Sequence, residues 1–238
     1  MCLLKSKIKI YYDKIDLSLR HKKFIDLILN DIEFFDNFDF DYIIEMVNKL
    51  DYRIFYNIIC SDIDYNFRFH IFDNILNFND YYFLSDHQIK TKRALQICNN
   101  YNLGNVISVG SWYGQHGWFL YNYSKITYNE IDVDCIDFLK KCFVDVIDGD
   151  MMKIDYFGYD TVINTSCEHI DYKKWISLIK SGTMVVLQST NMDHSEHMNI
   201  HRSLSDFIDE SNLKEILYKN EYDIVDCKHK RFFIVGIK

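Results

Sequence analysis

Side chains able to transfer a proton gather in two stretches of the second half of the sequence. In the first, six consecutive polar or thiol-bearing residues, Asn164 to His169, follow a short apolar run. Such groups are costly to bury without a purpose, although Asn164 and Ser166 could simply end a strand and cap the next helix. An imidazole beside a carboxylate can take a proton near neutral pH. The pattern therefore favours His169 as a catalytic base, with Glu168 orienting it.

The second stretch, residues 188–201, contains His194, Glu196, His197 and His201. We expect it to form a loop over the same site, which makes His197 an alternative general base with Glu196 beside it. Imidazole and carboxylate also suit zinc or iron. No known zinc spacing is matched, however, so the sequence favours substrate contact and predicts no metal.

The seven cysteines are scattered along the chain and include no Cys-x-x-Cys pair. This excludes a disulfide framework and a zinc ribbon, and it indicates a reducing, cytoplasmic compartment. Cys167 could be a nucleophile next to His169, but a buried structural thiol is the commoner role for such a residue.

A glycine-rich turn precedes both stretches. Gly110, Gly114 and Gly117 follow the apolar run 106–109 where a strand should pass into a helix. Glycine lets the backbone turn tightly and approach a ligand, and a helix N-terminus offers unpaired amides. We therefore expect this turn, including Ser111 and Trp112, to bind a ligand.

Two carboxylates stand at positions that suit a nucleoside. Glu130 ends the next predicted strand, where an acid can reach ribose hydroxyls. Asp132 is the alternative, but it is better placed to cap the following helix. Asp150 follows the third predicted strand and could accept the adenine amino group, with Met151 or Met152 covering the ring. An acidic turn with core methionines is the alternative interpretation.

The elements that would position these groups alternate regularly. Strands are predicted at 106–109, 125–131, 144–147, 160–164 and 183–188, and helices at 114–123, 133–143, 171–180 and 204–209. Strands separated by helices pair in parallel. Two further strand-like runs, 214–222 and 231–237, are too close for a helical crossover and should pair antiparallel. We predict an α/β fold: a doubly wound, mostly parallel seven-stranded sheet with an antiparallel C-terminal hairpin.

The first 83 residues have a different pattern. Apolar residues recur at helical spacing, as in Phe24, Leu27 and Ile28, which predicts three or four short helices. Strand pairing stays open for residues 65–78. The capping-box pattern from Ser85 to Gln88 marks the start of the second part. We therefore divide the chain into a mainly helical N-terminal extension, 1–83, and an α/β domain, 84–238.

Charge restricts the partners. The formal net charge of −8 argues against strong nucleic-acid binding, which depends on phosphate neutralisation. Basic runs at 90–93 and 228–231 are typical of solvated faces or of contacts to a cofactor phosphate. No run approaches the length of a transmembrane helix, so we expect no membrane association.

Taken together, residues 85–238 resemble the class I S-adenosylmethionine-dependent methyltransferase family, which the closing hairpin also favours over the nicotinamide dehydrogenases. In that family an acid-x-Gly-x-Gly-x-Gly turn holds the methionine part of the cofactor. Gly110 and Gly114 match its first and last glycines, whereas Ser108 replaces its acid and Trp112 its middle glycine.

The resemblance extends to the following strands. It implies that Glu130, with Ile131 beside it, binds the ribose, that Asp150 and Met151 contact the adenine, and that Asn164 lies near the transferred methyl. The implied cofactor is S-adenosyl-L-methionine.

The implied function is O-, N- or C-methylation of a small or medium acceptor, with residues 1–83 covering the site or forming a homodimer. An RNA acceptor stays open, but the proline-containing motif of amino-group DNA methyltransferases cannot occur without proline. The alternatives are another S-adenosylmethionine-consuming enzyme, such as a lyase or an aminopropyl transferase, and a catalytically silent cofactor-binding module.

Overall fold

The structure, a computed structural model, describes residues 3–14, 19–49, 55, 59, 65–74, 76, 85–120, 126–142, 145–224 and 228–238. The chain divides into two compact units, Met1–Ile89 and Lys90–Lys238. Each unit is considered by itself. No helix in the described ranges is both long enough and apolar enough to cross a lipid bilayer.

The first unit is helical wherever it is described. Its helices are α1 (Leu3–Lys14), α2 (Leu19–Asn30), α3 (Ile32–Phe35), α4 (Phe40–Lys49) and α6 (Tyr65–Asn74). Residues 65–74 are thus a helix and not a strand. Apolar residues also recur at helical spacing in 54–59, but Ile54 and Ile58 lie outside the described residues. The role of this part as a lid or dimerisation element stays a prediction.

Phenylalanine rings form the core of the first unit. Phe35 packs against Phe55 and Phe72, with ring centroids 5.7 Å and 5.3 Å away. Phe24 contacts Phe55 at 4.7 Å, and all four side chains are fully buried. Aromatic side chains bury large apolar areas, so a few of them stabilise a small helical unit.

The second unit is built on a seven-stranded sheet in the order β3-β2-β1-β4-β5-β7-β6. Its strands are β1 (Val106–Val109), β2 (Ile126–Glu130), β3 (Val146–Asp148), β4 (Thr161–Asn164), β5 (Met184–Thr190), β6 (Glu215–Asp223) and β7 (Lys230–Ile237). The first five pair in parallel, and β7 runs antiparallel to both β5 and β6. The predicted doubly wound sheet with its antiparallel hairpin is confirmed.

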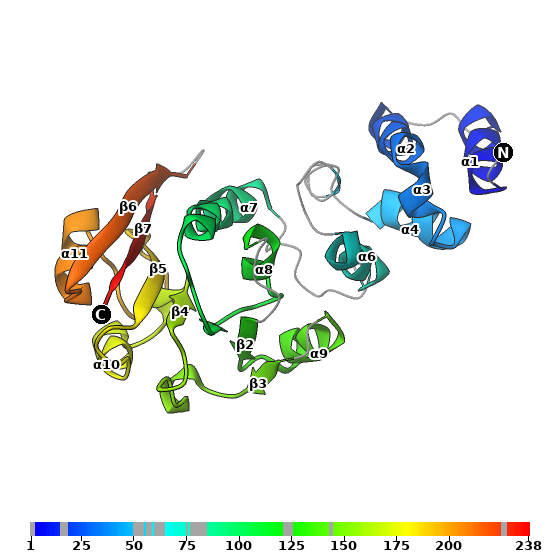
Figure 1. Cartoon of the computed structure of the whole chain (residues 1–238). Helices are drawn as coiled ribbons and strands as arrows, with labels where there is room; N and C mark the ends of the chain where they lie inside the picture. The colour runs from blue at the N-terminus through cyan, green and yellow to red at the C-terminus, as the bar shows by residue number, and fades with distance from the viewer. Residues whose placement is uncertain are drawn as a thin grey trace. The chain divides into compact units, whose positions relative to one another are not determined.

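Helices cover both faces of this sheet. The other elements are α7 (Asp86–Lys92), η3 (Arg93–Asn100), α8 (His116–Phe119), α9 (Val133–Cys142), η4 (Met151–Lys153), η5 (Cys167–His169), α10 (Tyr172–Ser177) and α11 (Leu204–Ser211). Both α10 and α11 lie on one side of the strands (Figure 1), whereas α8 contacts η3 and α9 contacts β2 and β3. This is the layer arrangement that alternating strands and helices predict.

The helix expected at 114–123 is much shorter than predicted. Of the described residues in this range, 114–120, only His116–Phe119 are helical, because the residues just before them still form a turn. Within this turn Gly114 has a positive φ, and so does Trp112 at 53°. Left-handed residues cannot belong to a right-handed helix, so the glycine-rich turn delays its start.

The core beneath α10 and α11 is aromatic and hydrogen-bonded. Trp175, Tyr172 and Phe207 are buried against strand residues such as Val162 and Leu187. The Trp175 indole donates a hydrogen bond of 2.9 Å to the Tyr156 hydroxyl. Buried Trp and Tyr polar atoms are thereby satisfied, as close packing requires.

We predict that Trp175→Ala lowers the free energy of unfolding of the second unit by about 3–5 kcal/mol, because it leaves a large cavity and frees the Tyr156 hydroxyl. Urea unfolding followed by fluorescence measures this unit alone, since all three tryptophans belong to it. Phe157→Ala, at a 73% exposed aromatic, is the control and should change stability little. Equal effects of the two substitutions would contradict the packing described.

Candidate active site

The predicted site residues meet at the carboxyl edge of the parallel strands. The register aligns Val109 with Asn129 and with Asn164, and Glu130 with Asp148. The turn at 110–114, the end of β2, the Asp150 turn and η5 therefore all leave the sheet at the same edge. Open α/β sheets place their ligands at this edge.

The turn that follows β1 is tightly specified. Gly110 has φ +55°, and a Cβ built on it would lie 3.0 Å from Met151 Cε, so a larger residue fits poorly. The Ser111 amide donates to the Asn129 carbonyl (3.0 Å), and its hydroxyl donates to the Ser108 carbonyl (2.7 Å). These bonds hold the turn against β1 and β2.

Glu130 fixes this turn through backbone amides. Its Oε2 accepts from the Trp112 N–H at 2.7 Å, and its Oε1 accepts from the Ile131 and Asp132 amides at 2.8 Å and 3.2 Å. Asp132 in turn accepts from the amides of Asp134 and Cys135, as the capping interpretation predicted. A carboxylate bound by amides is held in one orientation, and its remaining lone pairs can accept further hydrogen bonds.

Asp150 and Met151 form the neighbouring wall of the edge. Asp150 caps η4 by accepting from the Met152 amide at 2.9 Å, and its side chain is 37% exposed. The Tyr156 hydroxyl donates to the Met151 carbonyl at 2.7 Å, and Asn164 Nδ2 lies 3.7 Å from Met151 Sδ. The core pair of Trp175 and Tyr156 therefore anchors this wall from below.

A chain of buried polar side chains lies beside the turn. The Ser108 hydroxyl bonds to His116 Nδ1, and His116 Nε2 lies 2.7 Å from the Thr165 hydroxyl. Lys92 Nζ donates to the same hydroxyl and to the Thr165 carbonyl at 3.3 Å. Ser108 stands where the motif of the resembled family has an acid. Its side chain is thus buried and hydrogen-bonded to His116.

Two basic residues expected on solvated faces or at a cofactor phosphate are buried instead. Lys92 is 4% exposed and Arg231 is 8% exposed, although both belong to basic runs in the sequence. Sequence reasoning also missed His116 and Thr165 as partners of this network. The available signal was a single serine within the apolar strand Val106–Val109, which needs a buried hydrogen-bond partner.

Burial controls the charges of this network. It lowers the pKa of Lys92 to about 7, with the nearby Arg231 guanidinium adding to the effect. It also holds the pKa of His116 well below its usual value, and Lys92 adds to that. His116 is therefore a neutral imidazole that donates through one nitrogen and accepts through the other.

Glu168 and Arg231 form a buried ion pair between η5 and β7. Arg231 Nη1 donates to Glu168 Oε1, and Nη2 donates to the Thr165 carbonyl at 2.9 Å. Burial opposes the ionisation of Glu168, but the Arg231 charge together with hydrogen bonds and the nearby His169 outweighs burial and lowers the pKa of the carboxyl. Within the described ranges, Glu168 Oε2 is buried without a hydrogen-bond partner.

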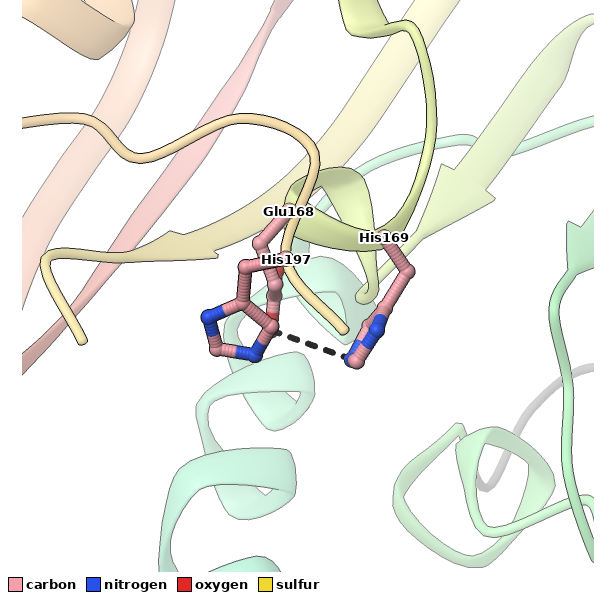
Figure 2. A group of neighbouring side chains, drawn as sticks. All are labelled: Glu168, His169 and His197. Carbon is pink, nitrogen blue, oxygen red and sulfur yellow. Dashed lines mark ion pairs between the residues drawn. The ribbon is translucent and has the colours of Figure 1, made fainter. Parts of the chain in front are cut away.

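The two predicted bases lie together. The rings of His169 and His197 are 4.8 Å apart and nearly perpendicular, and Figure 2 shows both beside Glu168. His169 Nε2 lies 4.0 Å from Glu168 Oε1, which is too long for a hydrogen bond. It is the backbone carbonyl of Glu196, not its carboxylate, that contacts His169 Nδ1, at 3.3 Å.

The other candidates of this region have other surroundings, although the His194 ring centroid lies 5.4 Å from that of His197. His201 is buried between Ser189 (2.6 Å) and Glu210 (3.1 Å), where it joins β5 to α11. His194 is exposed on the same loop. Cys167 is fully buried, and burial raises the pKa of its thiol well above the usual value, as expected of a structural cysteine.

A cavity of ≈ 530 Å³ opens at the opposite edge of the sheet. Gly104, Asp160, Gly182 and Met184, at the amino ends of the strands, line it. None of the predicted site residues borders this cavity. The chemistry-bearing groups and this cavity therefore occupy different edges of the sheet.

No protein-family model matches the sequence, and no curated protein matches it. Similar solved structures include a SAM-dependent methyltransferase from Archaeoglobus fulgidus, 16% identical with a TM-score of 0.48, covering 67% of this chain and 100% of that one. The PH0226 protein from Pyrococcus horikoshii is 13% identical, with a TM-score of 0.47 over 65% and 93% of the two chains. A TehB-like SAM-dependent methyltransferase from Corynebacterium glutamicum is also 13% identical, with a TM-score of 0.43 over 62% and 88%.

The buried amine makes stability pH-dependent. Between the folded pKa of Lys92, about 7, and its ordinary value of 10.5, the unfolded chain holds a proton that the folded chain has released. Stability attributable to this group therefore rises with pH across that window, by on the order of 1 kcal/mol per pH unit.

We predict that the free energy of unfolding of the wild type, minus that of Lys92→Met, increases from pH 7 to pH 9. Urea unfolding monitored by tryptophan fluorescence at each pH provides the measurement. Lys90→Met, two positions earlier at an exposed lysine, is the control and should give a constant difference. A constant difference for Lys92→Met as well would show that its amine keeps an ordinary pKa.

Proposed function

We propose that the second unit is an S-adenosylmethionine-dependent methyltransferase. The observation that carries this proposal is the meeting of the Gly110 turn, Glu130 and Asp150 at one edge of a 3-2-1-4-5-7-6 sheet whose seventh strand is reversed. The reversed strand belongs to the antiparallel hairpin on which the family resemblance seen in the sequence also rests. Nicotinamide dehydrogenases, in contrast, continue with parallel units.

The residues at this edge fit an adenosyl cofactor. Gly110, with φ +55°, lets the backbone turn without a side chain at the ligand edge, and Glu130 is held at the end of β2 where ribose hydroxyls can donate to it. Asp150 keeps a partly exposed carboxylate oxygen beyond its cap to Met152. An amino group can donate to that oxygen.

Two features of the edge are specific to this chain. Ser108 is occupied by His116, so the amino group of the methionine part must be held by other groups, such as the carbonyls of the turn. Met151 Cε lies against Gly110, so its flexible side chain must shift or pack on the bound molecule.

When bound, S-adenosylmethionine supplies an electrophilic methyl group on its sulfonium. The chain's own contribution is alignment and exclusion of water, because in-line displacement depends on positioning. We place the acceptor on the side of η5 and the β5–α11 loop, where Nε2 of His169 and His197 can take a proton or bind a ligand. Burial lowers the pKa of His169, so its imidazole is neutral at neutral pH.

We predict that Glu130→Gln weakens binding of S-adenosylmethionine by about tenfold or more, since hydrogen bonds to a charged acceptor each contribute about 1.5–3 kcal/mol. Isothermal titration calorimetry on the full chain measures it. Asp148→Asn is the matched control, because this carboxylate is paired in register with Glu130 but is 64% exposed. Equal affinities of the two variants would exclude Glu130 from the cofactor site.

The reaction type is decided by the product. Incubation with labelled cofactor and a fractionated extract of metabolites and RNA should yield S-adenosylhomocysteine together with label on an acceptor. Methylthioadenosine would instead identify a lyase or an aminopropyl transferase. Binding without any product, unchanged by replacing both His169 and His197, would identify a silent module.

A further inference from the structure

Three side chains with ligand atoms converge at the ends of β4 and β5. One potential ligand atom from each of Glu168, His169 and His197 lies within 4.8 Å of the other two. Figure 2 shows the two imidazoles turned toward each other with the Glu168 carboxylate beside them. Among the described residues, no other group of three or more histidine, cysteine and acidic side chains has its ligand atoms this close together.

Backbone hydrogen bonds hold the two segments of this cluster together. The amides of Met198 and Asn199 both donate to the Glu168 carbonyl, at 2.8 Å and 3.1 Å. The Asn199 side chain donates to the Ile170 carbonyl. The loop that carries His197 is therefore fastened to η5 by the protein itself.

The protonation of both histidines is set by carbonyl groups. His169 Nδ1 lies 3.3 Å from the Glu196 carbonyl, and His197 Nδ1 lies 2.7 Å from the Met192 carbonyl. A carbonyl can only accept, so each Nδ1 carries the proton and each Nε2 keeps its lone pair. Metal-binding histidines are commonly oriented in this way, with the second nitrogen donating to a carbonyl or carboxylate.

Glu168 supplies a carboxylate with one oxygen to spare. Its side chain is 2% exposed, and Arg231 binds only Oε1. Oε2 is buried and accepts no hydrogen bond from any described residue. A buried carboxylate oxygen is costly when it is unsatisfied, and a cation bound at this oxygen would remove the cost.

We propose that Glu168, His169 and His197 bind a divalent transition metal of the zinc type. Two imidazoles and one carboxylate are a ligand set that holds such a metal while leaving a coordination position open. This departs from the sequence expectation of no metal, which considered only the loop histidines. The site combines one of them with the pair that follows β4.

Binding requires a small contraction. Bonds of about 2.0–2.2 Å place neighbouring ligand atoms roughly 3.3 Å apart in a tetrahedral site. His169 Nε2 lies 4.0 Å from Glu168 Oε1, the three ligand atoms lie within 4.8 Å of one another, and the His169 side chain is 41% exposed. Rotation of this imidazole can close the gap without moving the core.

The surrounding charges indicate what occupies the open position. Arg231 is a cation bound to Glu168, so a metal adds positive charge to a site with a single carboxylate. An anionic oxygen, from hydroxide or from an ionised acceptor hydroxyl, restores the balance. The metal site does not depend on the proposed function, whereas this preference for an oxygen acceptor rests on it.

We expect the full chain to bind one equivalent of Co²⁺, followed by visible absorption and competed by Zn²⁺, without a thiolate charge-transfer band. Mg²⁺ should not compete, because it prefers oxygen ligands. His169→Ala and His197→Ala should each weaken binding at least tenfold and abolish the rise in melting temperature that Co²⁺ gives the wild type. His194→Ala removes an imidazole that packs on His197, with ring centroids 5.4 Å apart, but that is not one of the three ligands, so this variant should bind as the wild type does.

The proposal is overturned if the wild type binds no Co²⁺, if both ligand variants bind as well as the wild type, or if His194→Ala loses as much affinity. His169→Gln and His197→Gln repeat the test should an alanine variant fail to fold. Glu130→Gln should keep full Co²⁺ binding. A protein that binds metal but no S-adenosylmethionine would thus refute the proposed function and leave the metal site standing.

Discussion

The buried ion pair between Glu168 and Arg231 connects most of what is distinctive in the second unit. It joins residues 63 positions apart in the chain, one in the turn after β4 and one at the start of the reversed strand β7. Arg231 also binds the Thr165 carbonyl, which receives Lys92 from the other side. Because both charges are buried, losing either partner would leave the other uncompensated. The antiparallel hairpin is therefore part of the candidate site as well as an edge of the sheet.

Few of the buried polar side chains around this ion pair carry a charge. One carboxylate faces two basic groups, and burial lowers the pKa of one of them, Lys92, to about 7, so that its amine loses its proton readily near neutral pH. The amine of Lys92 is the group that yields, since guanidinium remains protonated in proteins. The Thr165 hydroxyl accepts a hydrogen bond from the Lys92 amine. The His116 imidazole links this hydroxyl to that of Ser108, and none of these groups adds charge. Hydrogen-bonded side chains thus surround Ser108 within this turn.

The cofactor side of the edge is stiffened from two directions. Glu130 binds the amide of Trp112, whose left-handed backbone occupies the place of a glycine at a cost of about 1–2 kcal/mol. On the other flank, the core tryptophan Trp175 holds Tyr156, which holds the carbonyl of Met151. Packing energy in the core is thereby used to position groups at the edge. The loop that carries His197 is fastened separately, by the amides of Met198 and Asn199, which donate to the Glu168 carbonyl.

Local sequence determined the alternation of strands and helices, the reversed hairpin and the positions of Glu130, Asp150 and Glu168, because hydrophobic period and glycine placement act over a few residues. Parallel pairing then brings all strand ends to one edge without further information. Only the tertiary structure decided that Lys92 and Arg231 are buried and that Ser108 hydrogen-bonds to His116. It also decided that His197 packs against His169, whereas His201 hydrogen-bonds to Glu210. These choices depend on contacts between distant segments, and a basic or imidazole side chain has the same local pattern whether it faces water or a buried partner.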